Sequence, residues 1–308
     1  MRKVIGIGET VLDIIFRDGQ PTAAVPGGSV FNGIVSLSRA GVQVRFVGET
    51  GDDRVGTITR DFMTANGIPT DHMGLLPGST SPISLAFLNE RNEADYTFYR
   101  NYAGQRLDVD LPPVERDDIV VLGSYYALNP VVRDKIVDLL ERARHAEAIV
   151  YYDPNFRSSH KEEAIKLAPT IIENLEYADI VRGAREDFRY MYGLEDADQI
   201  YREKVKFYCR NFILTEGAGT IKLRTNLVKK DYAVPPTSTV STIGAGDNFN
   251  AGVIFGLLKG GVRRNDLPSL GEAEWDVIVD SGMSFADDVC HSLSNSISEA
   301  FAHKMRGL

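Results

Sequence analysis

The sequence predicts an α/β fold in which a mostly parallel β-sheet has helices on both faces. Short apolar stretches typical of buried strands alternate with longer stretches whose apolar residues recur at helical spacing. The chain has 308 residues, which is enough for one large α/β domain or two small ones. We find no internal repeat and no low-complexity segment, and we expect a single domain over residues 1–308.

The first part of the chain predicts strands, a turn and two helices. Residues 3–8 (KVIGIG) are an apolar run typical of a buried strand, and residues 11–17 are a second apolar stretch. A Pro-Gly-Gly turn then precedes a helix, and Gly67 ends a later one. The elements expected after the turn are a helix at 29–39, a strand at 43–47 and a helix at 55–66.

Residues 83–100 differ from their surroundings in that they are rich in residues that favour β-strands. Two β-rich runs, ISLAFLNE and ADYTFYR, flank a polar link at 91–93, which is the pattern of a hairpin. Little helical sequence lies beside them, so we expect a small sheet outside the main body. Its apolar face, with Ile83, Leu85 and Phe87, must cover either a ligand site in the main body, which would be the sugar site if the resemblance given below holds, or a second copy of the same sheet.

From residue 118 onward, strands and helices alternate regularly. Residues 130–147, for example, place Ile136, Leu139 and Ala143 along one helical stripe. This alternation is typical of strand–helix–strand units in a parallel sheet. The expected strands are 118–123, 148–153, 179–181, 211–215 and 221–225, and the expected helices are 130–147, 161–175, 246–259 and 272–302.

Composition excludes several classes of protein. Lys and Arg total 34 against 43 Asp and Glu, a net charge of −9, so the chain has no general attraction for nucleic acid or an anionic membrane. Cys209 and Cys290 are expected to be free thiols in a reducing compartment. No run of 18 or more apolar residues occurs, and the apolar run after Met1 is too short for a signal peptide, so we expect a cytoplasmic protein.

The sharpest chemical signal is the run STIGAGDNFNAG at 241–252. Gly244, Ala245 and Gly246 lie where a loop becomes a helix, and their N–H groups form a positive helix end that suits a phosphate oxygen or a developing negative charge. Asp247 follows in the first helical turn, where a carboxylate can accept a hydroxyl proton. The alternative is a Gly-rich turn followed by an Asp that only favours the helix N-terminus.

Two other phosphate-binding motifs do not fit. The runs that begin at Gly6 and Gly244 both resemble G-x-G-x-x, but each lacks the third glycine of a dinucleotide fingerprint. The first run also continues into a stretch that is more typical of a strand than of a helix. The chain contains no G-x-x-x-x-G-K-[ST] segment, which excludes a P-loop kinase.

A second cluster lies near the start, where Gly27 and Gly28 precede a helix that carries Asn32. Two glycines before a helix let a ligand approach the backbone closely. Asn32 would face the same helix end one turn in, and Asp13 upstream could accept two sugar hydroxyls. Taken singly, each of these features has an ordinary structural explanation. The glycines could form only a turn, Asn32 could only start the helix, and Asp13 could be an exposed residue of a strand.

Together the two clusters resemble the two signatures of the ribokinase-like (PfkB-type) carbohydrate kinases, and the resemblance spans essentially the whole chain. The opening Gly6-x-Gly8-Glu9 looks more like the fructokinase and ketodeoxygluconate kinase branch than like ribokinase itself. Four segments in between are also similar to family segments: Gly48-x-x-Gly51-Asp52-x-x-x-Gly56, Phe98-Tyr99-Arg100, Asp153-Pro154-Asn155-x-Arg157 and Thr215-x-Gly217.

The resemblance implies a three-layer α/β/α domain with a small β lid built from about 11–25 and 83–100. It implies a sugar kinase that uses ATP and Mg²⁺, with Asp247 as the catalytic base, and we expect the lid to join two copies in a homodimer. The remaining site residues that it implies are an anion hole of Gly244, Ala245 and Gly246; a sugar site of Asp13, Gly27, Gly28, Asn32 and Arg100; and a nucleotide site near Thr215, Gly217, Asn155 and Asp187, with Asp187 close to Mg²⁺.

Three positions depart from the family pattern. The family usually has Asp where this chain has Ser241, near a monovalent-cation site, so the use of a monovalent cation is left open. The N-x-x-E motif tied to Mg²⁺ and phosphate falls at 184–187, where Ala184 and Asp187 replace the Asn and the Glu. Thr220 stands where a second glycine of the nucleotide loop is usual. Two alternatives therefore stay open: a catalytically weak sugar-binding sensor, and a nucleoside kinase.

Overall fold

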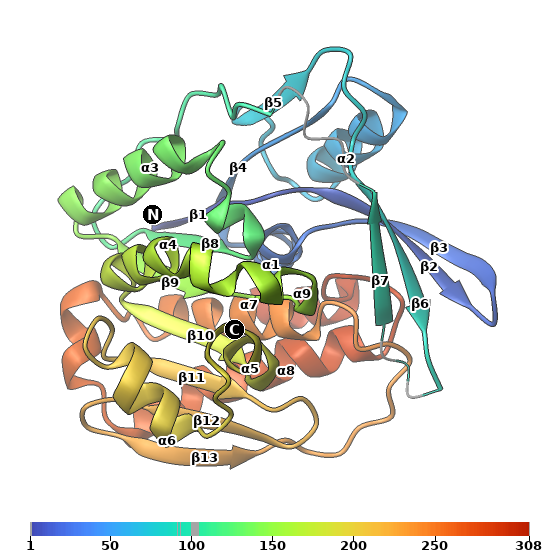
Figure 1. Ribbon diagram of the computed structural model, residues 1–308. Helices are drawn as coiled ribbons and strands as arrows, with labels where there is room; N and C mark the ends of the chain where they lie inside the picture. The colour runs from blue at the N-terminus through green and yellow to red at the C-terminus, as the bar shows by residue number, and fades with distance from the viewer. Residues whose placement is uncertain (1, 91, 93, 100–104, 308) are drawn as a thin grey trace.

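A computed structural model describes residues 2–90, 92, 94–99 and 105–307 of the chain (Figure 1). Among these residues, nine strands form the main sheet, and its central members pair in parallel, whereas β12 pairs antiparallel with both β11 and β13 at one edge. The predicted mostly parallel sheet is confirmed. From edge to edge, the strands are β13 (Lys229–Ala233), β12 (Thr220–Arg224), β11 (Phe212–Thr215), β10 (Ile180–Ala184), β9 (Ile149–Asp153), β8 (Ile119–Gly123), β1 (Lys3–Ile7), β4 (Gln43–Gly51) and β5 (Met73–Leu76).

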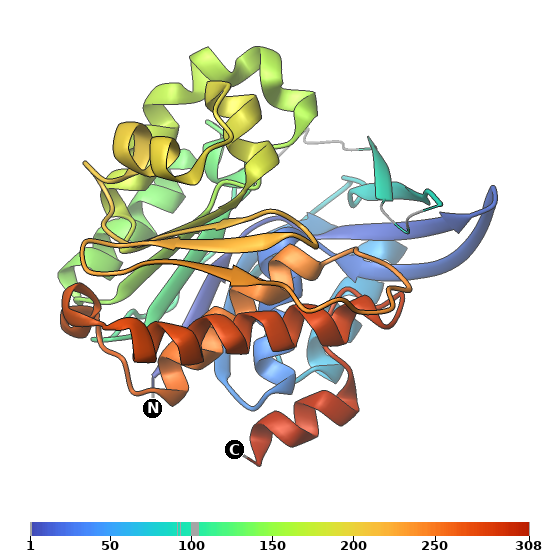
Figure 2. The same cartoon turned by 90° about the horizontal axis from the view of Figure 1, so that it is seen from below.

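Helices cover both faces of this sheet, as Figure 2 shows. Along the central strands, successive side chains enter opposite cores: Val4 packs in one and Ile5 in the other. The architecture is therefore the expected three-layer α/β/α. The first core contains α1 (Ser29–Arg39), α2 (Arg54–Ala65), α7 (Ala245–Lys259), α8 (Glu272–Cys290) and α9 (Glu299–Arg306), and the second contains α3 (Arg133–His145), α4 (Ala164–Tyr177), α5 (Arg185–Tyr192) and α6 (Ala197–Ile200).

Several elements differ from the sequence prediction. The predicted helix at 272–302 is two helices, because the stretch HSLSNSIS between α8 and α9 is rich in Ser and Asn, whose side chains bond the backbone and disfavour a helix interior. Ser298 in that stretch caps α9 instead. The apolar pattern does not predict β5, β13, α5 or α6. Short 3₁₀ or π turns occupy η1 (Tyr125–Leu128), η2 (Ser158–Glu163), η3 (Tyr201–Val205) and η4 (Arg264–Ser269), and η2 takes the start of the predicted helix at 161–175.

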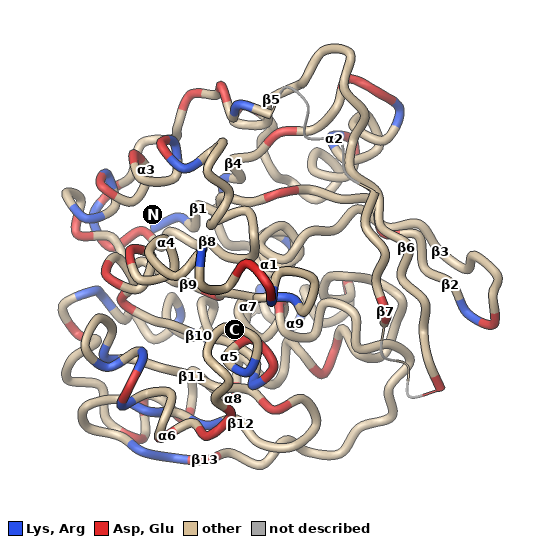
Figure 3. Tube along the Cα trace, viewed as in Figure 1, with Lys and Arg blue, Asp and Glu red and all other residues tan. Residues whose placement is uncertain are grey.

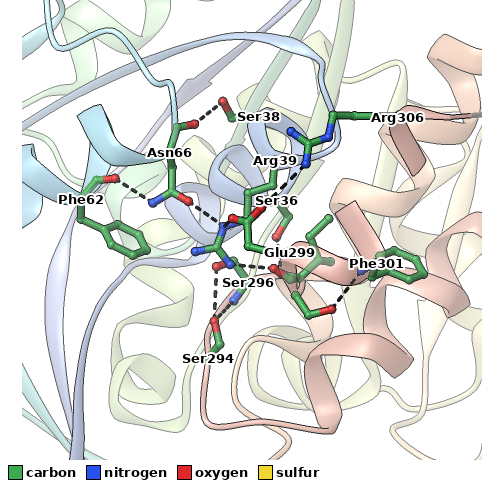
Figure 4. Close-up of polar contacts among 12 residues, drawn as sticks. Ser36, Ser38, Arg39, Phe62, Asn66, Ser294, Ser296, Glu299, Phe301 and Arg306 are labelled. Carbon is green, nitrogen blue, oxygen red and sulfur yellow. Dashed lines mark hydrogen bonds and ion pairs between the residues drawn. The ribbon is translucent and has the colours of Figure 1, made fainter. Parts of the chain in front are cut away.

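The loop between α8 and α9 is fixed against α1 (Figure 4). Arg39 donates from Nη1 to the carbonyl oxygen of Ile297 at 2.6 Å, and from Nε to Oδ1 of Asn66 at 2.6 Å. The backbone N–H of Ile297 donates to Oγ of Ser36 at 3.1 Å. These bonds hold the loop beside the helix that carries Asn32, so residues from both ends of the sequence meet there.

A second sheet, of four strands within the described ranges, projects from the main body (Figure 1). It is formed by the segments expected to make a lid, and we call it the lid sheet; its movement stays a prediction. β2 and β6 pair in parallel, with Asp13 opposite Ser84. The strand order is β3 (Gln20–Gly27), β2 (Val11–Arg17), β6 (Ile83–Leu88) and β7 (Ala94–Tyr99).

The two faces of the lid sheet have different surroundings. Ser84 and Ala86 are fully buried on the inner face, toward the body. Ile83, Leu85 and Phe87 alternate with them and so lie on the outer face, where Phe87 is 41% exposed. The side chains of Ile83, Leu85 and Phe87 therefore point away from the body, and contact of this face with a second lid stays a prediction.

Charged residues of both signs are mixed over the body (Figure 3). Arg142 pairs with Asp138 on α3 at 2.9 Å, and Arg224 on β12 pairs with Asp231 on β13 at 2.7 Å. In these pairs the charge of one side chain is offset by that of its neighbour, although the chain as a whole has a net charge of −9. Within the described ranges, no helix has the length and apolar character needed to cross a lipid bilayer.

Candidate active site

The glycine-rich motif forms the N-terminal end of α7. The helix starts at Ala245, one residue before the predicted start, and Gly244 precedes it with a φ of 74°. That conformation favours glycine, and a Cβ on Gly244 would lie 2.9 Å from the carbonyl oxygen of Asn295. The N–H of Ala245 closes a turn onto the carbonyl of Thr242 at 3.2 Å. The next N–H groups of the helix end belong to Gly246 and Asp247.

Asp247 lies in the first turn of α7 and lines a cavity together with Asp13. Nδ2 of Asn32 donates to its Oδ2 at 2.8 Å. Burial raises the pKa of Asp247 to about 7, although the hydrogen bond from Asn32 and the charge of Arg157 lower it. A carboxyl group with a pKa near neutrality suits a general base at physiological pH.

Asp13 lies in the middle of β2 and is 4% exposed. The hydroxyl of Ser84 donates to its Oδ1, and Nδ2 of Asn295 donates to its Oδ2 at 2.6 Å. Burial raises the pKa of Asp13 to about 6, and these two hydrogen bonds oppose the rise. A carboxylate has about four acceptor sites, so each oxygen keeps capacity for a ligand hydroxyl.

Gly27 and Gly28 are needed for close packing at the base of the lid sheet. A Cβ on Gly27 would lie 2.3 Å from Oδ2 of Asp13 and 2.6 Å from Nδ2 of Asn295. Gly28 has a φ of 130°, and a Cβ there would lie 2.2 Å from the carbonyl oxygen of Glu9. A side chain at Gly27 would therefore displace Asp13 or Asn295, and one at Gly28 would displace the turn at Glu9 between β1 and β2.

The cavity lies between the lid sheet and the body and has a volume of about 70 Å³. Four residues that were predicted for the sugar site or for catalysis line it together: Asp13, Gly28, Asn32 and Asp247. Aromatic faces beside hydroxyl, amide and carboxylate groups suit a polar ring compound. The other lining residues are Glu9, Val11, Ser29, Tyr96, Phe98, Ser124, Tyr125, Asn155, Arg157, Ser159 and His160.

The segments predicted to supply further ligand contacts are distributed differently. Arg100 lies outside the described residues. Asn155, predicted near the nucleotide, lines the cavity of Asp13, and its N–H donates to Oδ1 of Asp153 at 3.1 Å. Arg157 lines the same cavity with its Cζ 6.0 Å from the centroid of the Tyr96 ring. Asn155 and Arg157 therefore lie at the cavity that Asp13 lines, and the predicted contact of Asn155 with a nucleotide stays a prediction.

Thr215 and Gly217 lie at and beyond the end of β11. Thr215 is buried, and its Oγ1 accepts a hydrogen bond from Nη2 of Arg182 at 2.5 Å. Gly217 is exposed in the following turn with a φ of 59°, which explains glycine there. Thr215 is thus connected to the end of α7 through Arg182, as described below.

The departures at 184–187 and 241 have local explanations. Oδ2 of Asp187 accepts from the N–H of Ala184 at 2.7 Å and so caps α5. Burial raises the pKa of Asp187, and the charge of Asp153 raises it further. Oγ of Ser241 accepts from the N–H of Ile243 at 3.1 Å. Across the described part of the chain, no group of three or more His, Cys, Asp or Glu side chains is placed to hold a metal ion.

Some residues of the site have no signal in the sequence. Ser84 and Asn295 hold Asp13, yet their surroundings predict only a strand and a helix interior. Arg182 is different, because an arginine in the apolar strand IVRGA indicates a buried charge with a partner. Its partner is Asp153, whose Oδ2 lies 2.9 Å from Nη1.

Comparisons with known proteins give the family. The fructokinase of Klebsiella pneumoniae is 26% identical over 266 residues, which cover 85% of this chain and 87% of the relative. A probable chloroplastic fructokinase-6 of Arabidopsis thaliana is 25% identical over 284 residues, 88% of this chain and 72% of the relative. A crystal structure of a fructokinase double mutant from Vibrio cholerae O395, with fructose, ADP and a potassium ion bound, is 18% identical and superimposes with a TM-score of 0.85 over 99% of this chain and 98% of the other, which confirms the fold. Residues 1–267 match the family described as pfkB family carbohydrate kinase, and the chain therefore belongs to this family of ATP-dependent carbohydrate kinases.

Proposed function

We propose that the chain transfers the γ-phosphoryl group of ATP to a hydroxyl group of a sugar, in the manner of a fructokinase. The observation that supports this most directly is the position of Asp247. It follows the turn at Gly244, accepts a hydrogen bond from Asn32, and lines one cavity with Asp13. A base, a hydroxyl-binding carboxylate and an anion-binding helix end are thus gathered around one cavity.

In the proposed mechanism, Asp247 accepts the proton of the sugar hydroxyl while the hydroxyl oxygen attacks the γ-phosphorus. The bond between that phosphorus and the bridging oxygen of ADP breaks, and this oxygen keeps the electron pair. The N–H groups at the start of α7 hold the phosphoryl oxygens as charge develops on them. Asp13 accepts hydrogen bonds from other hydroxyl groups of the sugar and so fixes the orientation of the one that reacts.

Mg²⁺ bound to the nucleotide would neutralise part of the phosphate charge. It usually keeps several water ligands and needs few protein carboxylates. Asp187 would suit a contact with water bound to Mg²⁺. One of its carboxylate oxygens accepts from the N–H of Ala184, and the carboxylate can accept further hydrogen bonds from metal-bound water.

The outer face of the lid sheet supports a homodimer. Phe87 stacks on Phe16 there with ring centroids 4.8 Å apart, and both are at least partly exposed. A second lid would cover this apolar face. Phe87→Glu should lower the mass measured by sedimentation to that of a monomer, whereas Phe207→Glu, at a site that is 90% exposed, should not. A monomeric mass for the unmodified chain would exclude the dimer.

A nucleoside acceptor is a second candidate, and the aromatic side of the cavity favours it. The rings of Tyr96 and Phe98 stack with centroids 5.6 Å apart, and both side chains line the cavity. Such faces can pack on a heterocyclic base as well as on the apolar face of a sugar.

A panel of sugars and nucleosides with ATP and Mg²⁺, read by release of ADP, tests both candidates. We expect release with at least one sugar and its loss in Asp247→Asn, which keeps the shape of the side chain but cannot accept the proton. Release with nucleosides alone would establish the second candidate. Measurable sugar binding without ADP release at high Mg²⁺ would establish a sensor and refute the kinase mechanism.

A further inference from the structure

Arg182 lies between two parts of the chain that are predicted to contact phosphate. It belongs to β10, and its side chain is 8% exposed. Nη2 donates to Oγ1 of Thr215 at 2.5 Å. A Cβ on Gly246 would lie 3.1 Å from Nη1 and 3.2 Å from Nη2, so the guanidinium packs against the first turn of α7. The side chain thus joins the end of β11 to the predicted anion hole.

The guanidinium of Arg182 is held in one orientation. Nη1 donates to Oδ2 of Asp153 at 2.9 Å, and the same oxygen accepts from Nδ2 of Asn250 at 2.7 Å. The hydroxyl of Tyr151 donates to Oδ1 of Asn250 at 2.9 Å, which continues the network. The ring of Phe249 lies 5.6 Å from Cζ of Arg182. A cation fixed in this way does not have to reorganise when a negative charge forms beside it.

Arg182 also keeps unused capacity to donate hydrogen bonds. A guanidinium has five N–H groups, and the contacts with Asp153 and Thr215 use one each. Nε is buried and has no hydrogen-bond partner among the described residues. A buried donor without a partner is costly, and native proteins rarely keep one unless a ligand or water pairs with it.

The carboxyl groups around Arg182 explain why a cation is needed at this place. Burial raises the pKa of Asp187 and of Asp247, and the charge of Asp153 adds to both shifts, whereas the charge of Arg182 opposes them. A nucleotide triphosphate would bring still more negative charge into this region. A fixed positive charge offsets that repulsion.

We propose that Arg182 is a further catalytic residue, which binds the phosphoryl group during its transfer from ATP to the acceptor. This proposal rests on the proposed kinase function. As the hydroxyl oxygen attacks and the bond to ADP breaks, charge spreads over the phosphoryl oxygens, and the guanidinium donates to them beside the N–H groups of α7. Ala184 has no side-chain donor, and Arg182, two residues earlier on the same segment, supplies one.

Arg182→Gln tests this role, because it removes the charge but keeps a planar polar side chain. We expect kcat to fall by ~10²–10³-fold, as for loss of one charge-stabilising donor. The Kd for the acceptor should change by less than about threefold, because Arg182 does not line the cavity of Asp13. Arg182→Lys keeps the charge but cannot bridge Asp153 and Thr215. Its kcat should lie between those of the wild-type protein and Arg182→Gln.

Arg224→Gln is the matched control. Arg224 is also a buried arginine, paired with Asp198 at 2.6 Å and Asp231 at 2.7 Å, but it lies on β12, outside the site. Its replacement should lower the melting temperature and leave kcat near the wild-type value. Equal losses of kcat in the two variants, or an Arg182→Gln enzyme that keeps more than about a tenth of wild-type kcat, would overturn the proposal.

Nucleotide binding separates this proposal from the kinase function itself. Arg182→Gln should weaken ATP binding about tenfold in calorimetry while the affinity for adenosine stays unchanged, because only ATP carries phosphates. A wild-type chain that releases no ADP with any acceptor refutes the kinase function alone. Equal ATP affinity in wild type and Arg182→Gln refutes the phosphate contact.

Discussion

Replacing Asn32 with Ala should shift the pH dependence of the reaction by a calculable amount. Nδ2 of Asn32 donates to Oδ2 of Asp247 at 2.8 Å and stabilises the ionised form of that carboxyl group. A hydrogen bond to a charged group contributes roughly 1.5–3 kcal/mol, and one pKa unit corresponds to about 1.4 kcal/mol. Water that enters the vacated space recovers part of this energy. We therefore expect the pKa of Asp247 to rise by about one unit in the variant.

The assay is the pH profile of kcat/KM for the acceptor, measured with saturating MgATP. Asp247 must be ionised to accept a proton, so kcat/KM falls as pH drops through its pKa, which is about 7 in the wild-type protein. In Asn32→Ala this fall should begin about one unit higher. Asn32 also lines the cavity, so the plateau itself can drop, and the midpoint is the diagnostic quantity.

Ser84→Ala is the control for this profile. Its hydroxyl donates to Asp13 and not to Asp247, so its removal should leave the midpoint of the fall in place. An unchanged midpoint in Asn32→Ala, or an equal shift in Ser84→Ala, would show that Asp247 is not the group whose ionisation controls the rate.

Three further predictions concern the base, the metal and the lid sheet. Asp247→Asn should lower kcat by ~10²–10⁴-fold. Burial raises the pKa of Asp247 from 3.8 in the unfolded chain to about 7, so ionisation across this window destabilises the fold, and the variant should melt at a higher temperature than wild type at pH 8 but not at pH 4. Ala184→Asn with Asp187→Glu should lower the Mg²⁺ concentration for half-maximal rate, and an unchanged Mg²⁺ dependence would contradict the role given to this segment. Amide hydrogen exchange over 83–99 should slow when substrate saturates the site, and equal protection with and without substrate would exclude closure of the lid sheet.

The layered fold could be predicted from the sequence because its physical cause is local. The central strands are buried on both faces, as at Ile149–Asp153, and such strands read as continuous apolar runs between amphipathic helices. The position of Gly27 and Gly28 before a helix could be predicted for a similar reason, since they adjoin that helix in the sequence.

Other parts depend on contacts between segments that are distant in sequence. The stretch at 291–298 has apolar residues near helical spacing, but Ser and Asn side chains there bond to other elements and to the backbone. Phe87 points outward because Ser84 and Ala86 pack toward the body. The alternation along the strand predicts that the two sets of side chains lie on opposite faces, but it does not predict which face is turned to the body. Asn155 lines the cavity of Asp13, and it does so from the turn after β9, where its φ is 38°.

The bond between Asp13 and Asn295 joins residues that are 282 positions apart, and it has a consequence for synthesis of the protein. Asn295 also accepts, through its carbonyl oxygen, a hydrogen bond from Nδ2 of Asn248 at 2.9 Å, so it connects the lid sheet to the helix of the base. On the ribosome, chains grow at ≈ 5–20 residues per second, and early segments fold first. Asp13 therefore lacks this partner until the 282 residues that follow it up to Asn295 have been synthesised. A nascent chain can assemble most of its sheet before then, but it should acquire its ability to bind the acceptor only after the segment that carries Asn295 has emerged.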